Sequence, residues 1–366
     1  MLYRIKVELF RIRKFVSRSQ YNGLSLPYIF LIHMPRVFLL MAYKKTAKKI
    51  NDRLLAVSIN KYRMHKFHKK QISSLGNHFY VIVMPDTLHY LIPCLQLLPS
   101  ELNVFLIFNG AKTWERRLLL SEFKHRPSFK LYTLPFSSIN HGNVLNLFFH
   151  ANEKNFGIID HDLYIFDRNI FHHLKFSDDQ FMKAIFSGEN RFTGMVYPHT
   201  FFLFFNAAKI KQLMYHYKVD ARTYKELPRS VETSLASIGL NNNSFIKDYI
   251  RFYDTLHVLL ALGYVKGWQV DYLETEDVYH LGGTSMGAQY TKDLSHMYIS
   301  MRFLEFVNIP QLTDKYLPYM TPYTTSEQIN QKLGVNPEVL QMRNTLETIL
   351  AKLSQSLRIP AQKKSI

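Results

Sequence analysis

Four short apolar runs, separated by stretches long enough to form helices, follow one another between residues 79 and 159. They cover residues 79–84, 103–108, 129–134 and 156–159, of which the third also contains Lys130 and Thr133. Almost continuous apolar runs of this length are typical of strands buried on both faces. Strands that alternate with helices favour a parallel sheet with helices on its faces. The sequence therefore predicts an α/β fold with three layers and a mostly parallel sheet.

Charge is distributed unevenly over the 366 residues. Residues 1–70 hold 17 Lys and Arg but only Glu8 and Asp52 as acids, a net charge of +15, whereas the other 296 residues carry about +3. We expect three regions: a basic, mainly helical segment over 1–75, an α/β region over 76–290, and a helical segment over 291–366. A negatively charged partner would then meet the N-terminal segment.

The N-terminal segment is apolar between Leu24 and Tyr43, but Pro27 and Pro35 interrupt it. It fits neither an uninterrupted membrane-spanning helix nor a secretory signal. Two interpretations stay open: a segment lying on an anionic membrane surface, and a basic helical arm packed on the protein with its charges in water.

Helices are predicted from spacing and end signals in three parts of the chain. Residues 1–70 predict helical pieces with basic flanks, and Lys44 to Lys70 contains neither Gly nor Pro and has apolar residues at roughly helical spacing. Arg251 to Leu262 predicts a second helix that ends at Gly263. In the tail from Thr324 two helices are expected, the second starting at Asn336-Pro337.

Asp160-His161-Asp162 follows the fourth apolar run directly. Two carboxylates at i and i+2, where a strand gives way to a loop, can meet at one cation, and Mg²⁺ and Mn²⁺ favour oxygen ligands. In open α/β sheets, ligands bind outside the carboxyl ends of the strands. Two solvated acids in a turn are the alternative, and the strand context favours the ligand site.

A second unusual segment is His280-Leu281-Gly282-Gly283. Glycines allow a backbone to approach a ligand closely, and an imidazole can complete a metal site begun by carboxylates. A tight turn with a packed histidine is the alternative interpretation.

Together these segments resemble bacterial GT-A-fold glycosyltransferases, which use nucleotide sugars. The resemblance covers roughly residues 78–289 and implies a GT-A-like three-layer α/β/α catalytic domain with helical N- and C-terminal extensions. It implies that Asp160, Asp162 and His280 bind a divalent metal, Mn²⁺ or Mg²⁺, that bridges the diphosphate of the donor.

The same resemblance implies further donor-binding residues near the carboxyl ends of the strands. They are Pro85 and Asp86 after the first run, Asn109 after the second, His141, Gly142 and Asn146 in the helix before the DxD, Asp160 itself, and Gly282 and Gly283. It also implies that Asp254 is the catalytic carboxylate. The sequence lacks a Glu-Asp pair before Asp254 and a Gln-x-x-Arg-Trp after it, which are common in family 2 of these enzymes.

The expected activity is transfer of a sugar from a nucleotide sugar, a UDP-sugar first, to a glycan or lipid-linked acceptor of the surface-polysaccharide or lipopolysaccharide type. The basic segment over 1–70 suits a cytoplasmic enzyme that is peripheral on the inner face of a membrane. The single cysteine, Cys94, excludes an intrachain disulfide and fits a reducing compartment.

Two other classes of protein remain as alternatives. A phosphohydrolase of the haloacid dehalogenase type also has Asp-x-Asp after a strand, but near the chain start and followed by Thr or Val where this chain has Tyr164. A non-enzymatic protein could use the basic segment to bind nucleic acid or membrane, but no nucleic-acid-binding module is recognisable.

Overall fold

The computed structural model describes residues 12, 16, 24–72, 76–282, 284, 294–320 and 322–357. The chain forms two compact units. The first comprises Met1–Ala47, Met84–Leu97 and Tyr279–Ile366, and the second comprises Lys48–Val83 and Leu98–Val278. The division falls inside two elements, α3 (Met34–Leu55) and β11 (Val278–His280). Because β11 is paired with β5 (Leu163–Ile165), it is described with the second unit.

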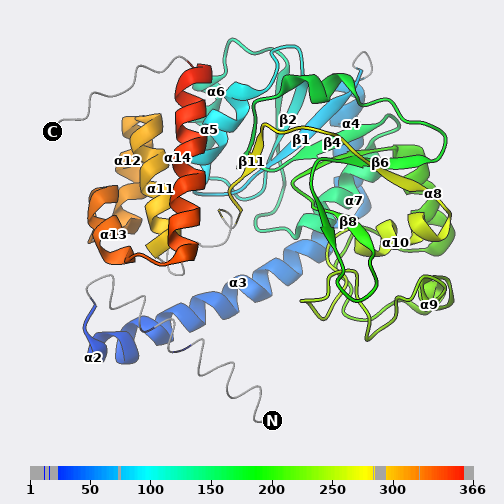
Figure 1. Cartoon of the computed structure of the whole chain (residues 1–366), viewed down its shortest axis with the longest axis horizontal. Helices are drawn as coiled ribbons and strands as arrows, with labels where there is room; N and C mark the ends of the chain where they lie inside the picture. Colours follow the sequence, from blue (N-terminus) through cyan, green and yellow to red (C-terminus); the bar gives the residue numbers. More distant parts are fainter. Residues whose placement is uncertain are drawn as a thin grey trace. The chain divides into compact units, whose positions relative to one another are not determined.

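A seven-stranded sheet forms the centre of the second unit (Figure 1). Its order is β10-β6-β9-β4-β1-β2-β3, and every neighbouring pair is parallel except those made by β9. The strands are β1 (His78–Val83), β2 (Asn103–Phe108), β3 (Phe129–Thr133), β4 (Phe156–Ile159), β6 (Gln180–Ala184), β9 (Phe202–Phe205) and β10 (Gln269–Tyr272). The prediction of an α/β fold with a mostly parallel sheet is confirmed.

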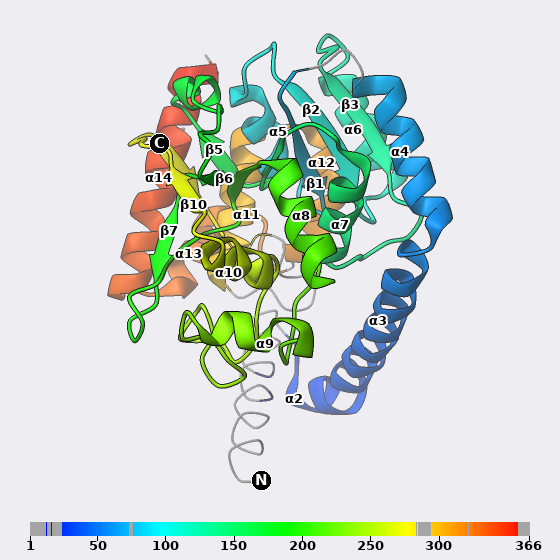
Figure 2. The ribbon, with the colours of Figure 1, turned by 90° about the vertical axis from the view of Figure 1, so that its right-hand side faces the viewer.

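Helices flank this sheet, and α7 and α8 lie together in front of it in Figure 2. The helices of this unit are α4 (Ser58–Ile72), α6 (Thr113–Glu122), η2 (Arg168–His172), α7 (His141–Ala151), α8 (Ala207–Tyr217), α9 (Arg229–Ala236) and α10 (His257–Val265). A short hairpin of β7 (Ser187–Glu189) and β8 (Val196–Pro198) completes it. Helix α7 packs against α4 and α8, so its apolar face is buried between helices and sheet.

The first unit contains a helical group built around α5 (Leu88–Leu97), in which every residue except Gln96 is buried. The other members are α11 (Leu294–Val307), α12 (Pro310–Tyr316), η3 (Leu317–Met320), α13 (Ser326–Leu333) and α14 (Pro337–Leu357). Arg302 binds Glu347 through two nitrogens and thereby ties α11 to α14. The predicted two-helix tail is confirmed, and Asn336 accepts a hydrogen bond from the Val339 amide at 2.9 Å as an N-terminal cap.

The N-terminal apolar segment forms α2 (Leu26–Tyr28), the π-helical turn η1 (Ile29–His33) and α3 without a break. Pro27 lies in the first turn of α2, and Pro35 follows η1, where the wider hydrogen bond from the Met34 amide to the Ile29 carbonyl avoids the usual clash. Among the described residues, Leu26–Leu55 is the one helix that is long enough to cross a membrane and contains an 18-residue stretch apolar enough to do so, with a mean hydropathy of 1.4. Core helices and signal sequences pass the same test.

Two predicted helices have different bounds in the structure. The helical stretch predicted over Lys44–Lys70 forms parts of two helices, α3 and α4, which are separated at Ala56–Val57, where the buried Asn60 side chain donates to the Leu54 carbonyl at 2.8 Å and ends α3. This local hydrogen bond competes with helix continuation.

The predicted helix Arg251–Leu262 starts only at His257, because Tyr253 instead exchanges two backbone hydrogen bonds of 2.8 Å with Tyr224. Gly263 does not end that helix. It lies within α10, where a Cβ would approach the Phe181 ring to 2.4 Å.

A buried polar network connects α4 to the amino end of β1. The Tyr80 hydroxyl lies 2.6 Å from His68 Nε2, and the Asn152 amide joins Tyr80 at 2.9 Å and His78 at 2.7 Å. Burial lowers the pKa of His68 to about 3, helped by repulsion from His78, and burial lowers the pKa of His78 to about 4. Both imidazoles are therefore neutral in the folded protein at neutral pH.

This network predicts acid sensitivity. The unfolded chain takes up protons on these histidines below about pH 6.5, while the folded protein does not until about pH 4. The free energy of unfolding should thus be highest above pH 6.5 and fall as the pH drops towards 4. Replacing His68 by Gln should reduce the slope of the free energy of unfolding against pH by about 1.4 kcal/mol per pH unit, because one proton fewer is taken up on unfolding.

Urea titrations between pH 7 and pH 4.5 measure this slope. The exposed His216, replaced by Gln, is the matched control, and it should leave the slope unchanged. Equal slopes for the two variants would show that the network does not set the acid sensitivity.

Candidate active site

Asp160 takes its position from the centre of the sheet. It follows β4, which pairs with β1 in parallel, so that Ile159 lies opposite Val81, and with β9 in antiparallel direction. Its amide donates to the Phe201 carbonyl at 2.8 Å. The chain proceeds outward from β1 to β2 and β3 and then returns to β4 on the other side of β1. This is a topological switch point, where open α/β sheets bind ligands.

A tight turn brings the second carboxylate round. The Leu163 amide contacts the Asp160 carbonyl at 3.3 Å, and the chain continues into β5. β5 pairs with β11, and the Phe166 amide donates to the Asp277 carbonyl at 3.0 Å just before β11. Strand pairing therefore carries His280 to the DxD turn across more than 110 residues of sequence.

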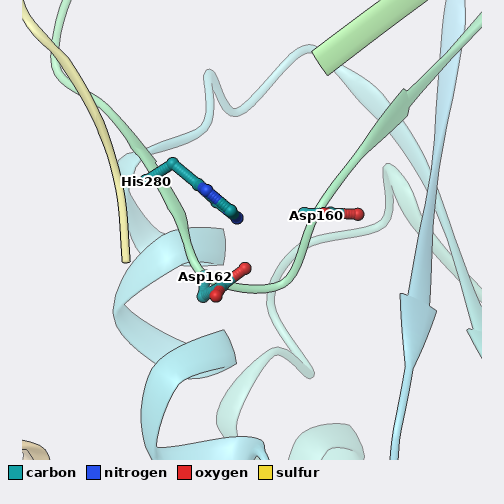
Figure 3. A group of neighbouring side chains, drawn as sticks. All are labelled: Asp160, Asp162 and His280. Carbon is teal, nitrogen blue, oxygen red and sulfur yellow. The ribbon is translucent and has the colours of Figure 1, made fainter. Parts of the chain in front are cut away.

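Asp160, Asp162 and His280 form one group that could hold a metal ion, the only such group found among the described residues (Figure 3). One ligand atom from each lies within 4.8 Å of the others. Asp162 is 2% exposed. Burial first, and then repulsion from Asp162, raise the pKa of Asp160 well above its ordinary value. A cation would relieve both effects, so the donor set fits a divalent metal.

Asp254 is linked electrostatically to this turn through His141. Desolvation lowers the pKa of His141 to about 4, opposed by attraction from Asp254 and helped by repulsion from His161. His141 begins α7, and its neutral ring thus lies within interaction range of both Asp254 and the residue between the two aspartates.

The loop before α10 holds Asp254 in place. Its amide donates to His257 Nδ1 at 3.1 Å, and its Oδ1 accepts from the Thr255 amide at 2.8 Å. Lys247 Nζ lies 3.4 Å from its Oδ2. The Asp254 side chain is 40% exposed, so one carboxylate edge is open to a substrate.

Three of the predicted donor-binding residues make contacts within the protein, and these contacts give each of them a structural role. The Asn109 side-chain amide donates to the Ile139 carbonyl at 2.9 Å and accepts from the Ile139 amide at 2.8 Å, and so fixes the loop before α7. A Cβ on Gly142 would lie 2.4 Å from the Ala221 carbonyl oxygen. Asn146 Oδ1 accepts from the Ala221 amide at 2.8 Å. These contacts position α7 and the loop at 221.

The remaining predicted residues lie in turns. Pro85 and Asp86 come directly after β1, with Asp86 at a left-handed φ of +63° and the turn closed by a 2.8 Å bond from the Thr87 hydroxyl to the Met84 carbonyl. Gly282 has a φ of +70°, and a Cβ there would lie 3.5 Å from His280 Cε1. A glycine therefore suits this turn, because position 282 needs a positive φ beside the His280 ring. Gly283 lies outside the described residues.

Three neighbours of the site were not predicted from the sequence: His161, Lys247 and His257. His161 was visible as the middle residue of the triplet, and its 6% exposure marks it as part of the packed turn. Lys247 and His257 had no recognisable motif, because they meet Asp254 through a loop whose conformation depends on the distant Tyr224.

A family comparison covers this site. Residues 57–210 match the family described as the StrH glycosyltransferase N-terminal domain, a range that includes β1 to β9 and the DxD turn. This part of the chain is therefore a glycosyltransferase domain, and Asp160 and Asp162 form its DxD-like site. The prediction of a glycosyltransferase is confirmed. No curated protein matches the chain in sequence.

Several solved glycosyltransferases are similar in outline. A mannosyltransferase from Pyrobaculum calidifontis, in complex with GDP-Man and Mn²⁺, is 9% identical with a TM-score of 0.34 over 86% of each chain. An active-site mutant of LgtC is 13% identical with a TM-score of 0.35, over 54% of this chain and 72% of that one. TarS from S. aureus, in complex with UDP-GlcNAc, is 14% identical with a TM-score of 0.31, over 77% and 81%. At these values the assignment rests on the family match.

The clustered carboxylates predict a metal effect on stability. Mn²⁺ at 100 times its dissociation constant should add about 2.7 kcal/mol to the free energy of unfolding and raise the melting temperature. Asp162→Asn removes one ligand charge, so the increase should disappear, while the melting temperature in EDTA stays equal or rises because the buried repulsion is gone.

Thermal unfolding with Mn²⁺ and with EDTA measures this difference. Asp178→Asn, which removes an exposed carboxylate outside the site, should keep the full response to Mn²⁺. The same Mn²⁺ response in wild type and Asp162→Asn would contradict a metal site at the turn.

Proposed function

We propose that the chain transfers a sugar from a nucleotide sugar, with UDP-sugars the first donors to test, to a glycan or lipid-linked acceptor of the surface-polysaccharide or lipopolysaccharide type, in a metal-dependent reaction. The observation that carries the proposal is the Asp160, Asp162 and His280 group at the switch point of a glycosyltransferase domain. In this proposal residues 76–290 are the catalytic domain, between the basic segment 1–75 and the helical segment 291–366.

Donor binding is assigned to the carboxyl ends of β1 and β4. Asp160, Asp162 and His280 would hold Mn²⁺ or Mg²⁺, which supplies Lewis-acid stabilisation of the leaving nucleoside diphosphate. Pro85, Asp86 and Gly282 are assigned to the donor because they occupy turns at or near these strand ends. Gly283 and the residues with structural contacts, Asn109, Gly142 and Asn146, remain assigned to the donor through the family resemblance alone.

The acceptor is assigned to a cleft of about 820 Å³ on the second unit. It is lined by the β7–β8 hairpin and the loop 242–251. The Asn190 side chain connects the hairpin to this loop by donating to the Phe245 and Ile246 carbonyls. Phe192 offers an exposed ring, and Asn243 offers a side-chain amide with donors and an acceptor. Such a mixture suits a sugar with apolar faces and hydroxyl edges.

Asp254 is proposed as the base that takes the proton from the attacking acceptor hydroxyl. Lys247 lines the acceptor cleft and contacts the Asp254 carboxylate, which connects this carboxylate to the acceptor side. The bond between His257 and the Asp254 amide fixes the loop, so that the exposed carboxylate edge faces substrate without rearrangement.

Peripheral attachment to the inner face of a membrane is proposed for residues 1–70. The net charge of +15 favours an anionic surface, at about 1 kcal/mol for each Lys or Arg that comes near it. Exposed Leu31 and Leu39 on the apolar helix, 77% and 72% exposed, offer side chains for insertion.

A screen of UDP-, GDP- and dTDP-sugars for release of the nucleoside diphosphate tests the proposed reaction. We expect slow hydrolysis of one donor in the presence of Mn²⁺, none in EDTA, and a loss of at least about 100-fold in Asp162→Ala, since metal stabilisation of the leaving group is removed. Asp178→Ala is the control.

The same screen separates the alternatives. Release of inorganic phosphate from phosphomonoesters, with no nucleotide-sugar hydrolysis, would identify a phosphohydrolase. Tight, salt-sensitive binding of RNA without any donor binding would identify a nucleic-acid-binding protein.

Asp254→Asn tests the base. If Asp254 accepts the acceptor proton, the substitution should lower kcat for transfer by about 100-fold or more, with the KM for the donor unchanged. Glu226→Gln removes an exposed carboxylate from the same cleft and should change kcat by less than about threefold. Equal, small effects of the two substitutions on kcat would exclude Asp254 as the base.

A further inference from the structure

A second cavity, of about 390 Å³, lies in the second unit against α7. The end of α3, the start of α4, α7 and the loop at residues 220–222 surround it. Its lining combines cations, amides and a small apolar floor: Lys49, Asp52, Arg53, Leu55, Ala56, Lys61, Asn143, Asn146, Leu147, His150, Asp220 and Arg222.

The cations of this cavity outnumber the available acids. Lys49, Arg53 and Lys61 have no acidic partner in the part of the chain that the structure describes. The two acids of the lining are already engaged. Asp52 accepts from the Asn140 amide and side chain, and Asp220 Oδ1 accepts from the Arg222 amide and Nε, both at 2.9 Å. The cavity therefore has a positive potential.

The wall of the cavity supplies groups that bind oxygen atoms. Asn143, Asn146 and His150 lie on one face of α7, at intervals of three and four residues. Burial lowers the pKa of His150, and the neighbouring Lys61 and Lys211 lower it further, in agreement with a positive field at this wall. Leu55, Ala56 and Leu147 form an apolar floor.

The surface of the second unit next to the cavity is apolar and basic at once. The apolar side chains are all between 42% and 64% exposed and lie in the same fourteen residues, 49–62, as three of the cavity's cations: Ile50, Leu54, Val57, Ile59 and Tyr62. A ligand that brings both a negative group and an apolar surface would match this combination.

We propose that this cavity binds the phosphate of an anionic phospholipid headgroup. Arg53 and Lys61 would contact the phosphate oxygens, the Asn143 side chain would contact the headgroup, and the exposed apolar side chains would enter the interface. The inference deepens the proposed membrane attachment: it assigns lipid recognition to a defined site in addition to the diffuse charge of residues 1–70.

Sedimentation of the full chain with vesicles tests the site. Phosphatidylcholine vesicles with and without phosphatidylglycerol are compared for wild type, for the pair Arg53→Gln and Lys61→Gln, and for a control pair with the same charge change, Lys66→Gln and Lys70→Gln. The control residues are exposed on α4 and do not line the cavity. The cavity pair should weaken binding to the anionic vesicles at least about tenfold more than the control pair does. Urea midpoints verify that both pairs fold.

If both pairs of substitutions weaken vesicle binding equally, the cavity is not a lipid site, and diffuse electrostatic attraction alone explains the binding. Wild type without preference for the anionic vesicles would overturn the lipid as ligand. Calorimetry with inorganic phosphate would then identify a site for a soluble phosphate, if binding depends on Arg53 and Lys61. Donor hydrolysis in the absence of vesicles is a separate readout, so failure of the lipid site is distinguishable from failure of the glycosyltransferase reaction.

Discussion

The burial of two neighbouring carboxylates, Asp160 and Asp162, is the constraint on which the rest of the site depends. Burial first, and then repulsion from Asp162, raise the pKa of Asp160, so two negative charges in this turn are unfavourable. The fold nevertheless holds them together, because β4 lies in the centre of the sheet and the turn is tied to β5, whose partner β11 brings His280. A binding site for a divalent cation resolves this otherwise unfavourable arrangement.

The site combines one side that lies on the sheet and one side that lies on a loop. The group of Asp160, Asp162 and His280 lies at the end of a mostly parallel sheet, while Asp254 lies on a loop fixed by Lys247, His257 and the Tyr224–Tyr253 pairing. His141, whose pKa is affected by Asp254 and by His161, connects the two electrostatically. Such a division suits a transferase, in which the diphosphate needs a fixed position and the acceptor side varies between enzymes.

Much of the sheet could be predicted from the sequence because three of the first four strands, β1, β2 and β4, are apolar runs bounded by polar turn residues. The DxD turn could be found for the same reason, since it follows such a run. The start of α10 could not be predicted, because it depends on the backbone pairing of Tyr253 with Tyr224, nearly thirty residues earlier. The break between α3 and α4 could not either, because a single buried Asn60 causes it. The contact between Lys247 and Asp254 depends on the conformation of the loop before α10, so no local sequence pattern predicted this contact.

Locating the metal directly tests the central claim. In crystals grown with Mn²⁺ and a nucleoside diphosphate, anomalous scattering should show one manganese ion between the carboxylates of Asp160 and Asp162, at about 2.0–2.3 Å from their oxygens, and next to the diphosphate. Manganese bound elsewhere, with the diphosphate seated away from the DxD turn, would contradict the account.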